Sequence, residues 1–347
     1  MIARLDQNRA QQRLPSRASL NESPMLVFYE LTQACDLVCQ HCRACAQRRS
    51  HPFELTTEES KRLIQQLTRF PRPPMLILTG GDPLKRPDVY ELIQYSTDQG
   101  LSVSITPSAT PLVTRNAIRR LRDAGVSRMA ISIDGSDAST HDSNRGVAGS
   151  FARSLEILRD AQDLFLETQV NTTLTPANVH QIDSMADLFD EFDIALWSVF
   201  FLVPIGRANA LARLDANHCE RAFDQLWHQS QRRSFLIKTT EAPHFRRFAI
   251  QHQIAERGEG NDHGPKLRPF VPAGINDGKG VMFVGHTGTI HPSGFLPIVC
   301  GMFPQQDVVD VYQRSPIFRR LRDANQLHGK CGDCEFRQIC GGSRARA

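Results

Sequence analysis

The stretch Tyr29-Glu-Leu-Thr-Gln-Ala-Cys35-Asp-Leu-Val-Cys39-Gln-His-Cys42 decides how the rest of the chain is interpreted. Its three cysteines are separated by three and then two residues, and they directly follow a segment typical of a buried strand. A loop with this spacing can wrap one small inorganic group. Three thiolates on a four-iron cube leave one iron without a protein ligand, and such an open position lets a metal site bind and activate a substrate.

Two other kinds of site fit the same cysteines. A zinc ion could bind these thiols together with Cys45 or His41, and Cys39 and Cys42 alone could form a thioredoxin-like redox pair. The chain has nine cysteines, of which four lie between Cys35 and Cys45 and three between Cys331 and Cys340. Clustering of this kind favours metal or redox chemistry over disulfides, and the spacing alone leaves the three alternatives open.

The composition narrows the class of protein. Hydrophobic residues make up 40% of the 347 residues and charged residues 22%, close to the averages for soluble globular proteins. No apolar run approaches the roughly 20 residues of a membrane helix, and the arginine-rich N-terminus lacks the apolar segment of a signal peptide. We therefore expect a cytoplasmic protein. The net charge is only +4, and the basic residues form no stripe with interleaved aromatic residues. We therefore do not expect a nucleic-acid substrate.

From Met25 onward, short apolar runs alternate with longer amphipathic stretches, the pattern of βα units around a parallel sheet. The predicted strands are residues 25–29, 75–79, 102–106, 128–133, 169–173 and 196–202. One predicted helix follows Thr56, which can form a capping box with Glu59; the others are residues 87–97, 115–124, 151–164 and 182–189. Six such units predict an α/β fold, a partial (β/α)6 barrel with ligands at the carboxyl ends of its strands.

The pattern also predicts three regions along the chain. Residues 1–24 are polar and without periodicity, which indicates a flexible tail. The barrel is expected to span residues 25–240. Residues 241–347 form a cysteine-rich C-terminal region, in which residues 281–284 and Ile290 are predicted to form a β-hairpin.

The Cys-x3-Cys-x2-Cys spacing after the first strand of a βα barrel resembles the motif of the radical S-adenosylmethionine (SAM) superfamily. The resemblance implies a [4Fe-4S] cluster on Cys35, Cys39 and Cys42, with SAM bound to the open iron through its amino and carboxylate groups. It further implies reductive cleavage of SAM to a 5′-deoxyadenosyl radical that abstracts hydrogen from a substrate, and an electron donor such as flavodoxin or ferredoxin. His41 stands where that family usually has an aromatic residue near the adenine.

Three later motifs are candidates for holding SAM. Gly80-Gly81-Asp82-Pro83 resembles the Gly-Gly-Glu-Pro motif that binds the SAM amino group, with Asp82 in place of the commoner Glu. Paired glycines let a ligand approach the backbone closely, although most such pairs are simple turns.

The other two motifs follow later strands. Ser132 and Asp134 alternate along one strand, so both can face the ribose hydroxyls, and Arg145 can pair with the SAM carboxylate. Asn171 on the fifth strand is a further candidate for SAM or substrate. Strand-end turns and ordinary packing explain these residues equally well.

A second group of cysteines, Cys331, Cys334 and Cys340, resembles the SPASM/twitch extension, which carries auxiliary iron–sulfur clusters in a subgroup of radical SAM enzymes. A zinc knuckle is the alternative. Where the extension often has a cysteine, this chain has Ser293, so Cys300 is a candidate fourth ligand. We expect at most one auxiliary cluster.

Together these motifs predict a radical SAM enzyme that modifies a peptide or a tetrapyrrole-type small molecule. The nearest relatives by resemblance are haem and haem-d1 pathway enzymes and peptide-maturing enzymes. The alternative is a non-catalytic or degenerate iron–sulfur or zinc protein that senses redox state.

Overall fold

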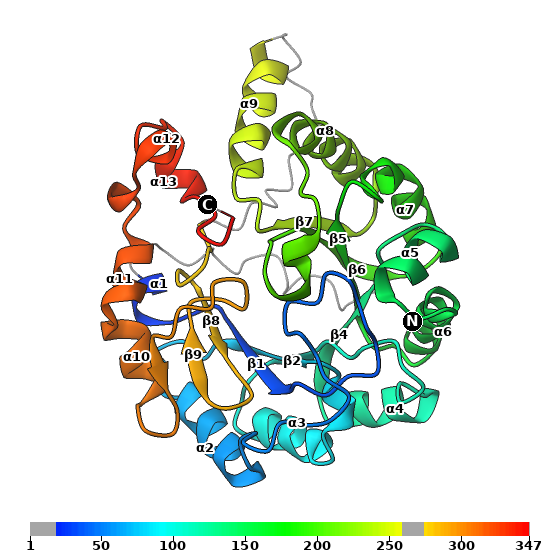
Figure 1. Ribbon diagram of the computed structural model, residues 1–347, viewed down its shortest axis with the longest axis vertical. Helices are drawn as coiled ribbons and strands as arrows, with labels where there is room; N and C mark the ends of the chain where they lie inside the picture. Colours follow the sequence, from blue (N-terminus) through cyan, green and yellow to red (C-terminus); the bar gives the residue numbers. More distant parts are fainter. Residues whose placement is uncertain (1–18, 259–273, 347) are drawn as a thin grey trace, which may run out of the picture.

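A curved ten-stranded sheet forms the centre of the computed structural model, which describes residues 19–258 and 274–346. Seven strands lie side by side in chain order, all parallel, with helices around their outer face (Figure 1). These strands are β1 Leu26–Thr32, β2 Met75–Gly80, β3 Val103–Ile105, β4 Val126–Ser132, β5 Thr168–Leu174, β6 Ile194–Phe201 and β7 Leu236–Thr240. The sheet stays open, with β7 and β10 at its edges, so the predicted partial barrel is confirmed.

The helices that cover the sheet begin close to the positions expected from the sequence, except the last of them, which was not predicted. Thr56 caps the first of them with both hydrogen bonds of a capping box, and Leu63, Ile64 and Leu67 on its inner face are buried. The covering helices are α2 Thr57–Leu67, α3 Val89–Asp98, α4 Arg115–Asp123, α6 Ser150–Asp163, α7 Ile182–Phe189 and α8 Ala216–Arg232. A further short helix, α5 Ala138–Arg145, is inserted after β4 and carries one of the predicted site residues.

One parallel strand was not expected. Strand β7 pairs with β6 from Leu236 to Thr240, but only Ile237 in it is buried, and Lys238 interrupts its apolar pattern. A strand at the edge of a sheet buries little surface, so its sequence carries little hydrophobic signal.

The C-terminal region completes the same sheet on its other side. Strand β8, Val281–Val284, pairs in parallel with β1, and it forms the predicted hairpin with β9, Thr289–His291. The two-residue strand β10, Gly301–Met302, follows β9. Side chains of β8 and β9 belong to the same apolar core as the barrel. The boundary predicted near residue 240 therefore does not separate two cores.

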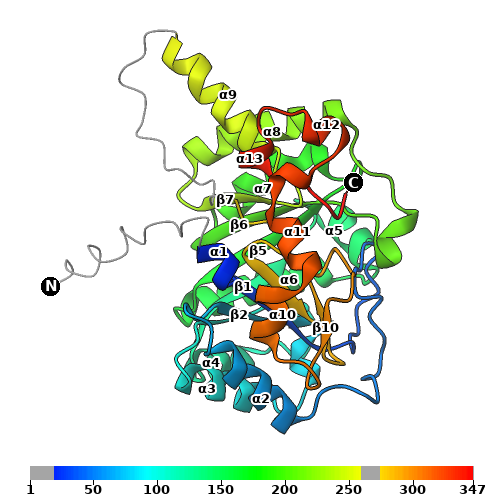
Figure 2. The same cartoon turned by 90° about the vertical axis from the view of Figure 1, so that its left-hand side faces the viewer.

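Helix α9, Phe245–Gly258, projects from one end of the barrel (Figure 2). The other helices of the C-terminal region pack along one side of it; they are α10 Val308–Arg314, α11 Pro316–Arg322, α12 Gly329–Gly332 and α13 Arg337–Cys340. The last of them, which ends at a cysteine, lies against α9. In the described part of the chain, no helix is both long and apolar enough to cross a membrane.

The predicted N-terminal tail is shorter than expected. Residues 1–18 lie outside the described part of the chain, but Ser19–Glu22 forms a helical turn, α1. Leu20 in this turn is buried, and the hydroxyl of Tyr312 donates a hydrogen bond of 2.7 Å to its carbonyl. Burial of one apolar side chain against α10 thus fixes a segment whose composition is otherwise polar.

We expect Thr56→Ala to lower the free energy of unfolding by about 1 kcal/mol, because the variant loses the side-chain cap of α2. Urea unfolding followed by circular dichroism measures the change. Thr68→Ala, at the other end of this helix, is the control, since its hydroxyl only donates to the carbonyl of Gln65. Equal stability of wild type and Thr56→Ala would contradict the prediction.

Candidate active site

The three N-terminal cysteines lie on a loop that is closed at its base. Beyond β1, the amide of Cys35 donates to the carbonyl of Gln47 at 2.7 Å, and the amide of Gln47 donates to the carbonyl of Gln33 at 3.0 Å. Cys35 and Cys39 are buried within the loop and Cys42 is half-buried. The loop thus holds three thiols at the carboxyl end of the first strand.

Hydrogen-bond donors surround the sulfur atoms. The amide of Leu37 lies 3.4 Å from the Cys35 sulfur, the amide of Ala46 lies 3.4 Å from the Cys42 sulfur, and a guanidinium N–H of Arg145 lies 3.7 Å from the Cys39 sulfur. Donors at this position stabilise thiolates, the form in which cysteine binds an iron–sulfur cluster. Burial raises the pKa of the Cys35 thiol, so this thiol keeps its proton without a metal. Metal binding would release that proton, because cysteine binds metals as the thiolate.

A single metal ion does not fit the described residues. Among residues 19–258 and 274–346, no three Cys, His, Asp or Glu side chains lie close enough to share one ion. His41, proposed as a zinc ligand, lies beside the carboxylate of Asp134 instead. All nine cysteines are free, so Cys39 and Cys42 form no disulfide.

The glycine pair after β2 is packed directly against the start of the cysteine loop. A Cβ on Gly80 would lie 2.4 Å from the carbonyl oxygen of Thr32, and one on Gly81 would lie 2.3 Å from that of Ala34. The amide of Gly81 also donates to Thr32 at 2.8 Å. Both glycines line the cavity above the cysteines. Only glycine permits this approach of two strand ends.

Asp82 is placed differently from what the motif predicts. Its carboxylate is fully buried, accepts a hydrogen bond of 2.8 Å from the Thr110 hydroxyl and another of 3.2 Å from the Leu84 amide, and does not line the cavity. Burial raises its pKa. The turn after Gly81 directs this side chain into the protein, where Asp82 holds the loop, and its contact with SAM remains a prediction.

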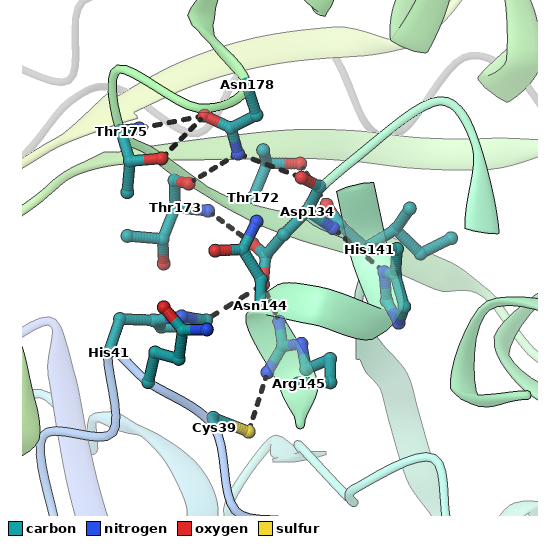
Figure 3. Close-up of polar contacts among 12 residues, drawn as sticks. Cys39, His41, Asp134, His141, Asn144, Arg145, Thr172, Thr173, Thr175 and Asn178 are labelled. Atoms are coloured by element: carbon teal, nitrogen blue, oxygen red, sulfur yellow. Dashed lines mark hydrogen bonds and ion pairs between the residues drawn. The ribbon is translucent and has the colours of Figure 1, made fainter. Parts of the chain in front are cut away.

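Asp134, Arg145, His41 and Cys39 form a connected polar network (Figure 3). One carboxylate oxygen of Asp134 forms an ion pair with Arg145 Nη2 at 2.6 Å and lies 3.3 Å from His41 Nε2. The other oxygen accepts a hydrogen bond of 2.7 Å from the Thr173 amide. Burial alone would raise the pKa of Asp134, but the Arg145 guanidinium outweighs it and lowers that pKa, so the carboxylate is ionised.

Asp134 lies behind the cavity wall, so its contact with the ribose remains a prediction. Strand β4 ends at Ser132, so the alternation of side chains no longer holds at Asp134, which is fully buried and does not line the cavity. Its role is to orient Arg145 and His41, which do line it. Burial lowers the pKa of His41 to about 4, so this imidazole is neutral.

The cavity itself lies above the cysteine loop and has a polar and an apolar side. The predicted residues that border it are Cys35, Cys39, Cys42, His41, Gly80, Gly81, Ser132, Arg145 and Asn171. The apolar side is formed by residues from the end of β6 and from the C-terminal region, namely Phe200, Phe201, Leu202, Val203, Ile205 and Phe295. Ser132 and Asn171 are register partners on neighbouring strands, which brings them together.

Three buried polar atoms of residues that line the cavity have no hydrogen-bond partner, namely His41 Nδ1, Arg145 Nε and Arg207 Nη2. Such atoms are rare in the interior of a protein, and at a cavity wall they suit a polar ligand. SAM offers a carboxylate for the guanidinium and a purine for the imidazole. The residues present therefore fit both the cluster and SAM.

Gly206 and Arg207, which follow β6, were not predicted as site residues. Arg207 donates to the carbonyl of Cys39 at 2.8 Å through Nε and to that of Cys42 at 3.1 Å through its amide. A Cβ on Gly206, whose φ is +60°, would lie 2.5 Å from the carbonyls of Cys42 and Arg43. Both residues hold the cysteine loop. Their signal in the sequence was only a glycine and an arginine after a strand, which packing explains as readily.

The C-terminal cysteines gather around the end of α13. Burial raises the pKa of the Cys340 thiol, and the neighbouring Cys331 and Cys334 raise it further. Asn276 fixes the turn by donating to the carbonyl of Cys340 at 2.9 Å. These contacts bring Cys340 within electrostatic reach of the other two thiols, and a shared cluster on the three remains a prediction.

Cys300 lies apart from these cysteines. It packs against the apolar core between β9 and β10, where its thiol donates to the carbonyl of Ile298 and burial raises its pKa to about 11. Ser293 instead hydrogen-bonds to the carboxylate of Asp277. Cys300 is thus held in the hairpin, and its role as the fourth ligand remains a prediction.

Comparison with known proteins identifies the family. Residues 29–189 match the model of the Radical SAM superfamily. An AdoMet-dependent heme synthase of Methanosarcina barkeri is 37% identical over 334 residues, which cover 95% of this chain and 93% of the relative. AdoMet is another abbreviation for SAM. A protein of the same name from Nitratidesulfovibrio vulgaris is 37% identical over 330 residues, 93% of this chain and 88% of that relative.

A solved structure agrees with the fold. Streptococcus suis SuiB bound to S-adenosylmethionine superposes with a TM-score of 0.71 at 16% identity, covering 93% of this chain and 73% of the other. The chain therefore belongs to the radical SAM superfamily, and it is an enzyme with a [4Fe-4S] cluster and SAM as cofactors. Its function is radical SAM chemistry on a tetrapyrrole or a peptide, which replaces the non-catalytic alternative.

We expect Gly206→Ala to bind much less iron and sulfide than wild type after anaerobic reconstitution, because its Cβ would displace the carbonyls of the cysteine loop. Gly149→Ala is the matched control: Gly149 also has a positive φ, of +82°, but nothing lies within 4 Å of its Cβ. Both variants carry about 1–3 kcal/mol of backbone strain. Equal iron content in the two would contradict the prediction.

We expect Arg145→Gln to lower the free energy of unfolding by roughly 3–5 kcal/mol, because it leaves the buried Asp134 carboxylate without its cation. The double variant Asp134→Asn with Arg145→Gln should recover most of this loss, since no buried charge is left unpaired. Chemical unfolding of both variants and of Asp134→Asn completes the cycle. A double variant as unstable as the sum of the two single ones would contradict the ion pair.

Proposed function

We propose that this enzyme uses SAM cleavage to convert a tetrapyrrole, with haem as the product. The observation that carries this proposal is the 37% identity, over more than nine-tenths of the chain, to two proteins named AdoMet-dependent heme synthase. The cavity supports it, because Phe200, Phe201 and Phe295 give one wall the apolar and aromatic character that suits a flat macrocycle.

In this proposal Cys35, Cys39 and Cys42 hold the cluster. When bound, the cluster supplies the electron that cleaves SAM and yields a 5′-deoxyadenosyl radical. Asp134 keeps Arg145 beside the Cys39 thiol, and the neutral His41 offers a ring face and an unpaired nitrogen to the ligand. The apolar wall excludes water, which protects a reactive radical from side reactions.

The remaining polar residues at the cavity are proposed to bind SAM. The backbone of Gly80 and Gly81 borders the cavity where its amino acid part would lie, and Ser132, Asn171 and Arg145 offer polar groups around it.

We also propose at most one auxiliary cluster, on Cys331, Cys334 and Cys340. Their spacing in the sequence and the effect of Cys331 and Cys334 on the pKa of Cys340 support this, and Cys300 is the candidate fourth ligand. The auxiliary cluster would lie in the C-terminal region, which contributes Phe295 to the cavity.

The proposal includes an electron donor such as flavodoxin or ferredoxin, which reduces the cluster. It also places the enzyme in the cytoplasm. Val38, between two of the cysteines, is 51% exposed, so the cysteine loop reaches the surface. Exposed Arg48 and Arg49 follow the loop and suit an acidic partner. A short path from the surface to the thiols supports electron delivery from outside.

A peptide is the second substrate class. It is favoured by the fold shared with SuiB, which is also solved bound to the precursor peptide SuiA. That similarity is at 16% identity and concerns the fold alone. The sequence relatives therefore weigh more than the structural one.

The first test combines two products. Anaerobically reconstituted enzyme with SAM and dithionite should release 5′-deoxyadenosine, detected by mass spectrometry, and should form haem from an iron-containing porphyrin precursor. We expect Cys39→Ala to release none, whereas Cys45→Ala should match wild type, because Cys45 has no place in the three-cysteine motif. SAM cleavage without haem from any such precursor would redirect the search to peptides, and no SAM binding would refute the proposal as a whole.

A further inference from the structure

A second pocket opens beside the cofactor cavity and shares Arg43 and Ile205 with it. Its walls come from the end of β1, from the cysteine loop, and from the β8–β9 hairpin. Because β8 is parallel to β1, its carboxyl end reaches the same mouth of the barrel. Any substrate that fills the apolar side of the cavity therefore borders this pocket.

The floor of the pocket is a buried carboxylate. Glu30, on β1, is 5% exposed, and its two oxygens take different partners. One lies 2.7 Å from Nη2 of Arg43, whose guanidinium also stacks on the ring of Phe283 at 4.6 Å. The other lies 2.6 Å from Nδ1 of His286. Burial alone would raise the pKa of Glu30, but Arg43 and His286 outweigh it and lower that pKa, so Glu30 is an anion.

This arrangement fixes which nitrogen of His286 is free. An ionised carboxylate accepts the Nδ1 proton, which leaves Nε2 of a neutral imidazole with its lone pair unshared. The hairpin holds the residue from the other side, since the His286 carbonyl accepts a hydrogen bond of 2.8 Å from the Leu55 amide. A histidine oriented by a carboxylate in this way is the usual form of a histidine metal ligand.

A second imidazole borders the same pocket. Nδ1 of His291, on β9, is buried and has no hydrogen-bond partner. Burial lowers the pKa of this histidine, so it too is a neutral nitrogen donor. The pocket thus offers the lone pairs of His286 Nε2 and His291 Nδ1 next to an apolar cavity wall. The buried carboxylate of Glu30 at this pocket is neutralised by Arg43.

We propose that Nε2 of His286 is an axial ligand to the iron of an iron-containing tetrapyrrole substrate, with Glu30 as the residue that positions it. The proposal rests on the proposed function and goes further, because it makes His286 the residue that selects an iron-loaded ring over a metal-free one. Iron insertion must then precede this enzyme, so the reaction that supplies its substrate is a chelation of iron or acts on a ring that already holds it.

The same Glu–His pair could instead transfer protons during turnover. The two roles differ in one respect. A proton carrier leaves the spectrum of bound iron unchanged, whereas a ligand determines it.

The test uses the reconstituted full-length enzyme with haemin and with metal-free protoporphyrin as probes. In wild type, electron paramagnetic resonance and absorbance of bound haemin should report nitrogen-ligated iron. His286→Ala should lose that signature and bind haemin about 10- to 100-fold more weakly, with metal-free protoporphyrin bound as before. Added imidazole should restore the signature in the variant.

His51→Ala is the matched control, because its ring lies 5.3 Å from that of His286 but its Nδ1 accepts only the amide of Phe53. It should keep the wild-type spectrum. Glu30→Gln should retain a nitrogen ligand with a changed spectrum. An unaltered spectrum in His286→Ala would refute the ligand role while the proposed function stands, and failure of the wild type to bind either porphyrin would count against both.

Discussion

The site depends on backbone contacts that leave no room for a side chain. The cysteine loop is pressed between the end of β2, at Gly80 and Gly81, and the turn after β6, at Gly206. These contacts join opposite parts of an open sheet through a single loop. The positions of the three thiols are thus fixed by close contacts between the backbone of the barrel and the backbone of the loop.

Electrostatics adds a second layer to this arrangement. A [4Fe-4S] cluster on three thiolates brings negative charge into a buried place, and the guanidinium groups of Arg145 and Arg207 lie at the loop that would carry it. Asp134 then balances Arg145 from behind. The result is a chain of alternating charges that starts at a cysteine sulfur and ends in the protein interior. Breaking it at any member leaves a buried charge without compensation, which is the costly case.

How far the sequence led can be judged from particular elements. The covering helices and the six inner strands were predictable because each buries a regular apolar stripe, and the cysteine loop was predictable from its spacing. Strand β7 and the packing of Leu20 were not, since an edge strand and a single buried leucine carry almost no pattern. At the site, Asp82 was assigned to SAM by resemblance to the Gly-Gly-Glu-Pro motif, and Asp134 by the alternation of side chains along its strand. Which way a carboxylate points after a strand has ended depends on the turn, and no spacing rule encodes it.

The pairing of β8 with β1 has a consequence for how the chain must be made. Leu26 is the register partner of Val281, so the first strand of the barrel receives its outer neighbour only after some 255 further residues have been synthesised. Until then β1 is a bare sheet edge with a long apolar face, the kind of surface that pairs with other copies and aggregates. A fragment that ends near residue 240 would keep every cysteine of the first loop and still aggregate, because β1 would be an unprotected sheet edge.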